Sequence, residues 1–142
     1  MIALATDHNG YKMKEELKPM LEKAGIEYTD FGPDMLDPAD DYPVFAAKVA
    51  EAVSSGSADY GVLICGTGIG MAIAANKFKG VRAVNSSDKF CIERSRMHNN
   101  ANVICLGESL IDTSTALELI KAFIFTDFEG GRHQNRIDMF ND

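Results

Sequence analysis

A cysteine leads directly into a glycine-rich turn in the segment Gly61-Val-Leu-Ile-Cys-Gly-Thr-Gly-Ile-Gly70. Glycines allow positive φ and a close approach of the backbone, so the N–H groups of such a turn can converge on an anion. The same dipoles would stabilise the thiolate of a cysteine placed there. The segment therefore indicates covalent or acid–base chemistry on an anionic or carbonyl-containing ligand.

Polar residues that could bind a ligand or transfer a proton also follow two other short apolar runs. Asp7 and His8 come directly after the run 1–6, and Asp41 and Tyr42 lie in the loop that follows the next run. In open α/β sheets, ligands bind at the carboxyl ends of the strands. We therefore expect these residues to cluster with the cysteine turn at one edge of a sheet.

His98 and Asn99 do not follow this rule, because they precede the apolar run 101–106. That order places them at the amino-terminal edge of their own sheet, away from the cysteine turn. If His98 belongs to the site, the simplest arrangement is that it serves the site of a neighbouring subunit.

The segment that begins at residue 127 is broken by glycines and then holds Arg132, His133 and Arg136 close together. A four-residue spacing places Arg132 and Arg136 on one helical face if this tail coils. The planar guanidinium fork suits a phosphate group, although solvated tail charges remain the alternative.

Short apolar runs alternate with amphipathic stretches along the chain, as is typical of a parallel sheet with crossover helices. The pattern predicts a three-layer α/β domain with a five-stranded parallel sheet flanked by helices. Pro19 predicts a kink or an early end in the first helix. The expected strands span residues 1–6, 26–31, 59–65, 80–84 and 101–106, and the expected helices span 11–24, 44–54, 71–77, 88–97 and 113–126.

Length and composition favour one domain over residues 1–142. A chain of this size with 46% hydrophobic residues can bury about 70% of its unfolded surface without a disulfide or a structural metal. A formal charge of −7 argues against a nucleic-acid partner. No apolar stretch has the length of a signal peptide or a membrane span, so no membrane partner is expected.

The three cysteines are odd in number and lack C-x-x-C spacing, which argues against a disulfide framework or a zinc ribbon. A reducing, cytoplasmic location is therefore expected. Cys91 and Cys105 lack a glycine turn and are expected to be packing residues. The loop 32–41 carries four carboxylates, but their spacing matches no calcium loop, so it is expected to be a solvated acidic loop.

Five motifs together resemble the family of type B ribose-5-phosphate isomerases and galactose-6-phosphate isomerases. They occur in the order and spacing of that family over nearly the whole chain. The motifs are Asp7-His-x-Gly10, Asp41-Tyr-Pro43, Ile64-Cys-Gly-Thr-Gly-Ile-Gly70, His98-Asn-x-Ala-Asn-Val103 and Gly130-Gly-Arg-His-x-x-Arg136. The resemblance implies a Rossmann-like domain that interconverts aldose and ketose phosphates without a metal or other cofactor. It also implies a homodimer or homotetramer, with sites shared between subunits.

The resemblance further implies roles for individual residues. Cys65 would be the base, and His98 would open the sugar ring with Asn99 beside it. Thr67 would move a proton between the substrate oxygens. The remaining substrate-binding residues would be Asp7, His8 and Tyr42, the turn residues Gly66, Gly68, Ile69 and Gly70, and the tail residues Arg132 and Arg136, with segment 128–142 contributing to the phosphate site.

The chain departs from this family pattern at Ser109, where many type B members carry an arginine. One phosphate contact is therefore expected to be missing. From the residues alone, His8 could instead cap a helix, and His98 could be a surface histidine.

The most favoured substrate is ribose 5-phosphate, converted to ribulose 5-phosphate. The alternatives are a hexose phosphate, such as galactose 6-phosphate or allose 6-phosphate, and a non-catalytic sugar-phosphate sensor on the same fold. A thiol redox or flavodoxin-like protein is disfavoured because no resolving cysteine lies at short spacing.

Overall fold

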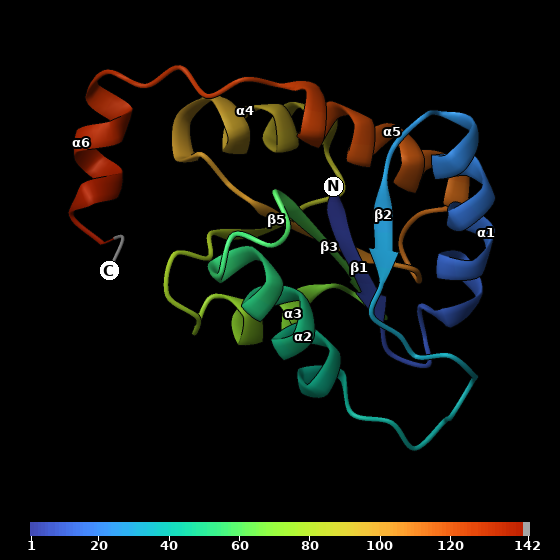
Figure 1. Cartoon of the computed structure of the whole chain (residues 1–142). Helices are drawn as coiled ribbons and strands as arrows, with labels where there is room; N and C mark the ends of the chain where they lie inside the picture. The colour runs from blue at the N-terminus through green and yellow to red at the C-terminus, as the bar shows by residue number, and fades with distance from the viewer. Residues whose placement is uncertain (141–142) are drawn as a thin grey trace.

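The computed structural model describes residues 1–140, which form one five-stranded sheet with helices on both faces (Figure 1). All neighbouring strands pair in parallel, in the order β2-β1-β3-β5-β4. The predicted three-layer α/β architecture is therefore confirmed. The strands are β1 (Ile2–Thr6), β2 (Tyr28–Asp30), β3 (Tyr60–Cys65), β4 (Ala83–Asn85) and β5 (Val103–Gly107).

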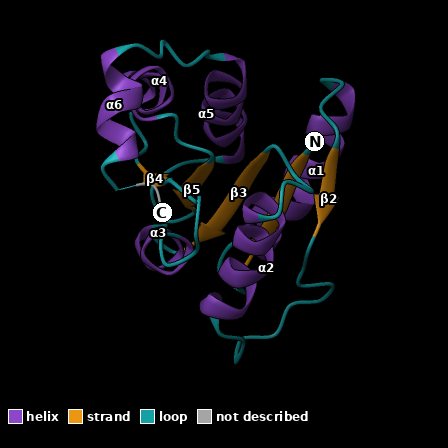
Figure 2. Cartoon of the chain, turned by 60° about the vertical axis from the view of Figure 1, so that its left-hand side comes forward, coloured by secondary structure: helices purple, strands orange, loops and turns teal. Residues whose placement is uncertain are grey.

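The helices divide between the two faces of the sheet (Figure 2). Helices α1, α4 and α5 pack with one hydrophobic cluster, and α2 and α3 with the other, while α6 packs against α4. In the described part of the chain, no helix has the length and apolar character needed to cross a membrane. The helices are α1 (Tyr11–Lys23), α2 (Tyr42–Ser54), α3 (Ile69–Ala75), α4 (Lys89–Asn99), α5 (Thr113–Phe125) and α6 (Arg132–Asp138).

The two central strands are buried on both faces, as their nearly continuous apolar sequences predict. Along β3, Val62 and Ile64 point into the cluster beneath α1, α4 and α5, whereas Leu63 and Cys65 point into the cluster beneath α2 and α3. This alternation follows from the two-residue period of a strand. It aims the Cys65 side chain at the layer that contains α3.

Several predicted boundaries were wrong. The edge strands β2 and β4 have three residues each, shorter than the sequence indicated, because an edge strand pairs on one side only. Helix α1 continues through Pro19 to Lys23, so the early end was wrong. Pro19 is exposed, and water can reach the carbonyl that it leaves without a helical partner.

Two further differences concern the site. Helix α3 begins at Ile69, two residues earlier than predicted, so the glycine turn leads into it without a gap. Helix α4 continues to Asn99 and ends where Asn100 adopts a left-handed conformation with φ 48°. His98 and Asn99 therefore lie in the last helical turn.

A buried lysine fixes the loop after β2. The Lys14 side chain is completely buried, and its ammonium lies 2.7 Å from Asp30 Oδ2. The same group donates a hydrogen bond to the carbonyl of Pro33 at 2.8 Å. Because a buried charge is tolerated only when it is paired and hydrogen-bonded, this cluster anchors the start of the loop that carries Asp40.

Candidate active site

The glycine turn wraps around the sulfur of Cys65 at the carboxyl end of β3. Cys65 is 6% exposed, and the backbone N–H of Gly68 donates to its Sγ at 3.1 Å. Thr67 Oγ1 accepts from the N–H of Ile69 at 3.3 Å. The turn therefore aims one backbone donor at the Cys65 sulfur and another at the Thr67 hydroxyl.

Two glycines of the turn are required by close contacts. Gly68 has φ 84°, and a Cβ there would lie 2.5 Å from Asn85 Nδ2 and 2.9 Å from the carbonyl carbon of Leu106. A Cβ on Gly70 would lie 2.7 Å from the ring of Tyr42. The turn can therefore sit on the end of β5, and the Tyr42 ring packs against it, while the contact of Tyr42 with a sugar stays a prediction.

Asn85 holds the turn by two side-chain hydrogen bonds, although it was not among the predicted site residues. Asn85, at the end of β4, donates from Nδ2 to the carbonyls of Thr67 at 3.1 Å and Cys105 at 2.9 Å. Cys105 is completely buried, and burial raises the pKa of its thiol, with a further contribution from Cys65. Cys105 is thus a neutral packing residue, as predicted.

The end of β1 brings Asp7 to the same edge of the sheet. Its Oδ1 accepts from the backbone N–H groups of Asn9 at 2.9 Å and Gly10 at 3.2 Å. A Cβ on Gly10 would lie 2.7 Å from the carbonyl oxygen of Ile64, so this turn packs tightly against the strand that carries Cys65. Asp7 and the cysteine turn are therefore brought together, as predicted.

His8 is held by an aspartate from the acidic loop. Asp40 Oδ1 accepts from the backbone N–H of His8 at 2.9 Å and lies 2.7 Å from its Nδ1. This hydrogen bond is the main reason that the pKa of His8 is raised, and the charges of Asp7 and Asp40 add to it. The expectation of a wholly solvated loop was wrong for Asp40, whose side chain is 9% exposed.

The remaining predicted residues form a second group on α4 and α6. The His98 side chain is 37% exposed, and Asn99, Arg132 and Arg136 are exposed. The tail does coil into α6, so the two arginines lie four residues apart on one helix, as predicted. Their guanidinium groups are available to an anion.

One chain does not bring the two groups together. Cys65 pairs with Gly107 at the carboxyl end of β5, whereas His98 lies just before the amino end of that strand. The five residues of β5 span about 13 Å at the usual strand rise. Figures 1 and 2 both show α6 at the end of the domain away from α1, which begins just after His8.

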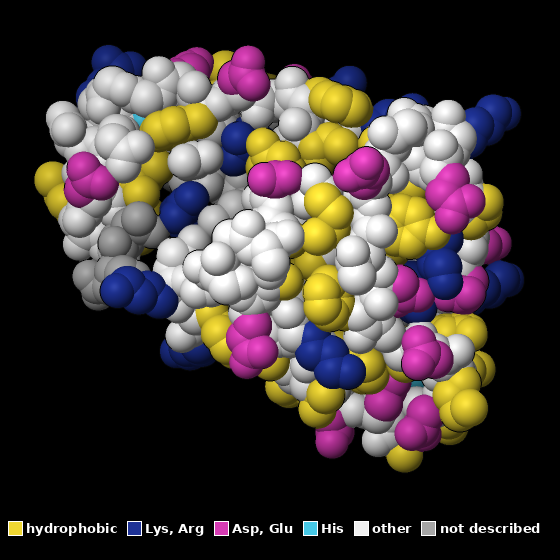
Figure 3. Space-filling model, viewed as in Figure 1, with side chains coloured by type: hydrophobic (Ala, Val, Ile, Leu, Met, Phe, Trp, Pro, Cys, Tyr) yellow, Lys and Arg dark blue, Asp and Glu magenta, His cyan; other side chains and the backbone are white. Residues whose placement is uncertain are grey.

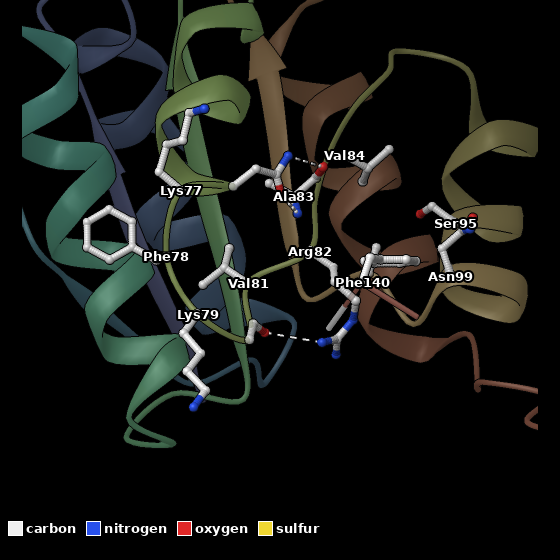
Figure 4. A pocket seen from close by; sticks show the side chains of 13 residues that line it. Lys77, Phe78, Lys79, Val81, Arg82, Ala83, Val84, Ser95, Asn99 and Phe140 are labelled. Carbon is white, nitrogen blue, oxygen red and sulfur yellow. Dashed lines mark hydrogen bonds between the residues drawn. The ribbon is translucent and has the colours of Figure 1, made fainter. Parts of the chain in front are cut away.

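A cavity of about 770 Å³ lies beside the second group, bounded by the segment after α3, by α4 and by the tail. Asn99 lines it, and Arg82 projects into it beside Phe140 (Figure 4). Figure 3 shows the surface hollowed on the side where α6 stands apart from the body of the domain. Cys65 does not line this cavity, so this cavity lies away from the thiol.

Two clusters in residues 1–140 gather possible metal ligands within 4.8 Å of one another. Asp7, His8 and Asp40 form one, but backbone donors and the His8 ring already engage one oxygen of each carboxylate. His98, Glu129 and His133 form the other.

Cys91 corrects one expectation, because it is exposed rather than packed. Its thiol lies 3.4 Å from Asp88 Oδ2, and this hydrogen bond raises its pKa. Asp88 also caps α4 by accepting from the N–H of Phe90. All three cysteines of the chain are free thiols.

Comparisons with known proteins find relatives over nearly the whole chain. A family model described as Ribose/Galactose Isomerase matches residues 2–140. Ribose-5-phosphate isomerase B from Escherichia coli is 42% identical over 137 residues, covering 96% of this chain and 91% of that protein.

Solved structures of similar proteins cover nearly the whole chain. Ribose-5-phosphate isomerase B from Clostridium thermocellum superimposes with a TM-score of 0.94 at 42% identity, covering 99% of this chain and 94% of that one. Ribose-5-phosphate isomerase B from Mycoplasma genitalium, solved with bound ribulose-5-phosphate, superimposes with a TM-score of 0.92 at 42% identity. The match covers 97% of this chain and 91% of that one.

Proposed function

The chain belongs to the ribose/galactose isomerase family, and we propose that it interconverts ribose 5-phosphate and ribulose 5-phosphate. Aldose–ketose isomerisation moves one proton between carbon 2 and carbon 1 through an enediolate. It therefore needs a base and a partner for the negatively charged oxygen. The observation that carries the proposal is the Cys65 thiol within a turn of backbone donors at the carboxyl edge of the sheet.

Cys65 Sγ removes the proton from carbon 2 of the aldose and returns it to carbon 1. Thr67 moves the hydroxyl proton from oxygen 2 to oxygen 1, so the atoms balance without a redox partner. The first-turn N–H groups of α3 at Gly70 and Met71 have no carbonyl within the helix to accept them. They are free to hold the enediolate oxygen, and one such preorganised donor is worth about 3 kcal/mol.

His8, Arg132 and Arg136 bind the phosphate, while Asp7 and Tyr42 contact the sugar. The raised pKa of His8 supports this role, because it keeps a positive charge on the ring to a higher pH. Arg132 and Arg136 supply the geometry that a phosphate group prefers. His98 opens the furanose ring, with Asn99 beside it.

The active site is shared between two copies of the chain. Cys65 and His98 lie at opposite edges of one sheet, so a single chain cannot bring both to one small sugar. Helix α3 also exposes Ile69 at 54% and Ile73 at 60%, four residues apart and therefore on one face. This apolar face beside the cysteine turn suits a homodimer interface, and dimers can pair further into a tetramer.

The proposed role of Cys65 requires a reduced thiol. None of the three cysteines is in a disulfide, and free thiols persist in a reducing compartment. We therefore place the protein in the cytoplasm, without a cofactor and without a nucleic-acid or membrane partner.

A hexose phosphate is the second candidate substrate, because of Ser109. This short, exposed side chain stands where many type B members carry an arginine, and its backbone N–H donates to Gly66 at 3.1 Å. A serine next to the turn leaves room for one more carbon unit. The alternative therefore predicts turnover of galactose 6-phosphate or allose 6-phosphate.

Proton exchange in heavy water tests the reaction and the substrate together. The protein is incubated with each aldose phosphate, and the loss of the carbon 2 proton is followed by NMR. We expect exchange with ribose 5-phosphate and a fall of about 10³-fold or more in Cys65→Ala. The control variant Cys91→Ser should retain the wild-type rate. Exchange with no sugar phosphate, or undiminished exchange in Cys65→Ala, would contradict the proposal.

A further inference from the structure

Three side chains meet where the C-terminal segment docks on the end of α4. The rings of His98 and His133 are stacked, with centroids 4.3 Å apart and planes 13° from parallel. Nε2 of each ring lies 3.5 Å from the same oxygen, Oε1 of Glu129. Two imidazoles therefore share one carboxylate, and one of them is the proposed ring-opening histidine.

The ring geometry argues against a metal ion at this cluster. An imidazole nitrogen binds a metal through a lone pair in the plane of its ring, at about 2.0–2.1 Å for zinc. When two rings lie nearly parallel at a stacking distance, their planes do not meet within bonding distance of both nitrogens. His98 and His133 therefore cannot both bind one ion without rotating.

The chain backbone holds this cluster together. The N–H of Glu129 donates to the carbonyl of Met97 at 3.1 Å, one residue before His98. Arg96 Nε donates to the carbonyl of Thr126 at 3.1 Å. The tail is thus fixed to the last turn of α4 before α6 begins, so the stacked rings do not depend on the conformation of a free tail.

The two histidines differ in exposure and in environment. His133 is 8% exposed. Burial is the main reason that the pKa of His133 is lowered, and the charges of His98, Arg132 and Arg136 lower it further. The Glu129 carboxylate acts in the opposite direction. His98 has more than a third of its side chain in solvent. His133 is therefore the fixed neutral support, and His98 is the ring that can reach a substrate.

We infer that His133 and Glu129 are positioning residues for His98, the first by covering one face of its ring and the second by facing its Nε2. This inference rests on the proposed ring-opening role of His98. A carboxylate facing Nε2 keeps a proton on that nitrogen and leaves Nδ1 as the acceptor. Because α6 begins at Arg132, the same contacts also fix the phosphate-binding arginines relative to the ring-opening histidine.

A comparison of two reactions separates this role from simple docking of the tail. Ribose 5-phosphate is largely a closed ring, so its isomerisation includes ring opening. Ribulose 5-phosphate is open-chain, and exchange of its carbon 1 proton with heavy water requires Cys65 but no ring closure. The ratio of the two rates therefore reports the ring-opening step, while a displaced arginine would change both rates.

The variants are His133→Ala, His133→Phe and Glu129→Gln, with His98→Asn as the reference. We expect His133→Ala and Glu129→Gln to lower the ratio by about 10-fold to 100-fold, the cost of a misplaced catalytic group. His133→Phe keeps a stacked ring and should recover part of the loss. The exposed neighbour Gln134 provides the matched control Gln134→Ala, which should keep the wild-type ratio.

A second measurement reports on the His98 ring directly. The chain has three histidines, so long-range proton–nitrogen NMR spectra of histidine-labelled protein give three resolvable rings. Glu129→Gln should change the nitrogen shifts of His98 and of His133 but leave those of His8 unaltered. Unchanged His98 shifts in this variant would overturn the proposed contact with Glu129.

The outcomes distinguish the inference from its premise. If His98→Asn lowers the ratio but His133→Ala and Glu129→Gln reduce both reactions equally, the cluster only docks the tail and the positioning role is wrong. If His98→Asn itself leaves the ratio unchanged, the ring-opening role of His98 is wrong. His133 and Glu129 then do not position a ring-opening group.

Discussion

A backbone N–H group contacts the Cys65 thiol, whereas side chains contact the His98 ring. At the carboxyl edge of the sheet, strand ends and a glycine turn fix the thiol through N–H groups and close packing. At the amino edge, the end of α4 and the start of the C-terminal segment meet through two stacked rings and a shared carboxylate.

This difference matches the chemistry proposed for each region. Stabilising an enediolate needs donors fixed before the charge develops, and backbone groups of a sheet edge provide them. Opening a sugar ring and holding a phosphate need long side chains that reach across to a ligand. In the proposed mechanism, two chains each contribute one of these regions to an active site, so distinct failures are expected when either region is altered.

The largest effect is expected when the backbone of the first region is disturbed. In Gly68→Ala, the new Cβ would meet Asn85 and the carbonyl carbons of Leu106 and Cys105 at 3.0 Å or less. Activity should fall by about 100-fold or more, because the donor to Cys65 moves. The free energy of unfolding, measured with denaturant, should fall as well.

Gly56→Ala is the matched control for this variant. Gly56 has nearly the same φ, 82°, but a Cβ there would have nothing within 4 Å. It should cost about 1 kcal/mol of unfolding free energy from the left-handed backbone alone and leave activity intact. Equal losses of activity in the two variants would contradict the role given to the turn.

The next effect concerns the side chains of the second region. Arg136→Ala should raise the KM for ribose 5-phosphate by about tenfold, because a hydrogen bond to a charged group contributes about 1.5–3 kcal/mol. Unphosphorylated ribose should be turned over at an unchanged, low rate. Lys121→Ala, an exposed cation on α5, is the control. An unchanged KM in Arg136→Ala would remove this arginine from the phosphate site.

A smaller, pH-dependent effect is expected from Asp40→Asn in the first region. Asp40 raises the pKa of His8, so the wild-type ring stays protonated to a higher pH. Without this carboxylate, the pKa of His8 falls, and the rise in KM with pH should begin at a lower pH. Near pH 7 the difference should be about threefold. Asp34→Asn, in the same loop, should leave the KM profile unaltered.

The smallest effect is expected from Ser109→Arg, which restores the arginine of the family pattern beside the cysteine turn. An additional exposed cation should lower the KM for ribose 5-phosphate by about twofold to threefold. The effect should shrink in high salt, because exposed charges are screened. A raised KM at low salt would show that the position does not face the phosphate.

The strand-end residues could be predicted from the sequence because their positions follow from one rule of parallel sheets. Cys65, Asp7 and Tyr42 come together where apolar runs end. The same rule placed His98 at the opposite edge, which the continuation of α4 to Asn99 supports.

Residues that act through tertiary contacts could not be predicted in this way. Asp40 is one of four carboxylates in its loop, and only the fold singles it out by placing His8 beside it. Asn85 is an ordinary polar residue whose hydrogen-bond partners lie 18 or more positions away in the chain. Glu129 lies about 30 positions from His98, the ring that it contacts. Sequence spacing does not indicate contacts of this range.

Complementation between two inactive variants is the most direct test of the shared site. Cys65→Ala and His98→Asn chains are mixed, unfolded and refolded together, and the mixed dimers are assayed with ribose 5-phosphate. A shared site gives each mixed dimer one intact site with Cys65 from one chain and His98 from the other. Random pairing in a two-fold dimer then recovers about a quarter of the wild-type activity. Activity no higher than that of the two parent variants would contradict a site built from two chains.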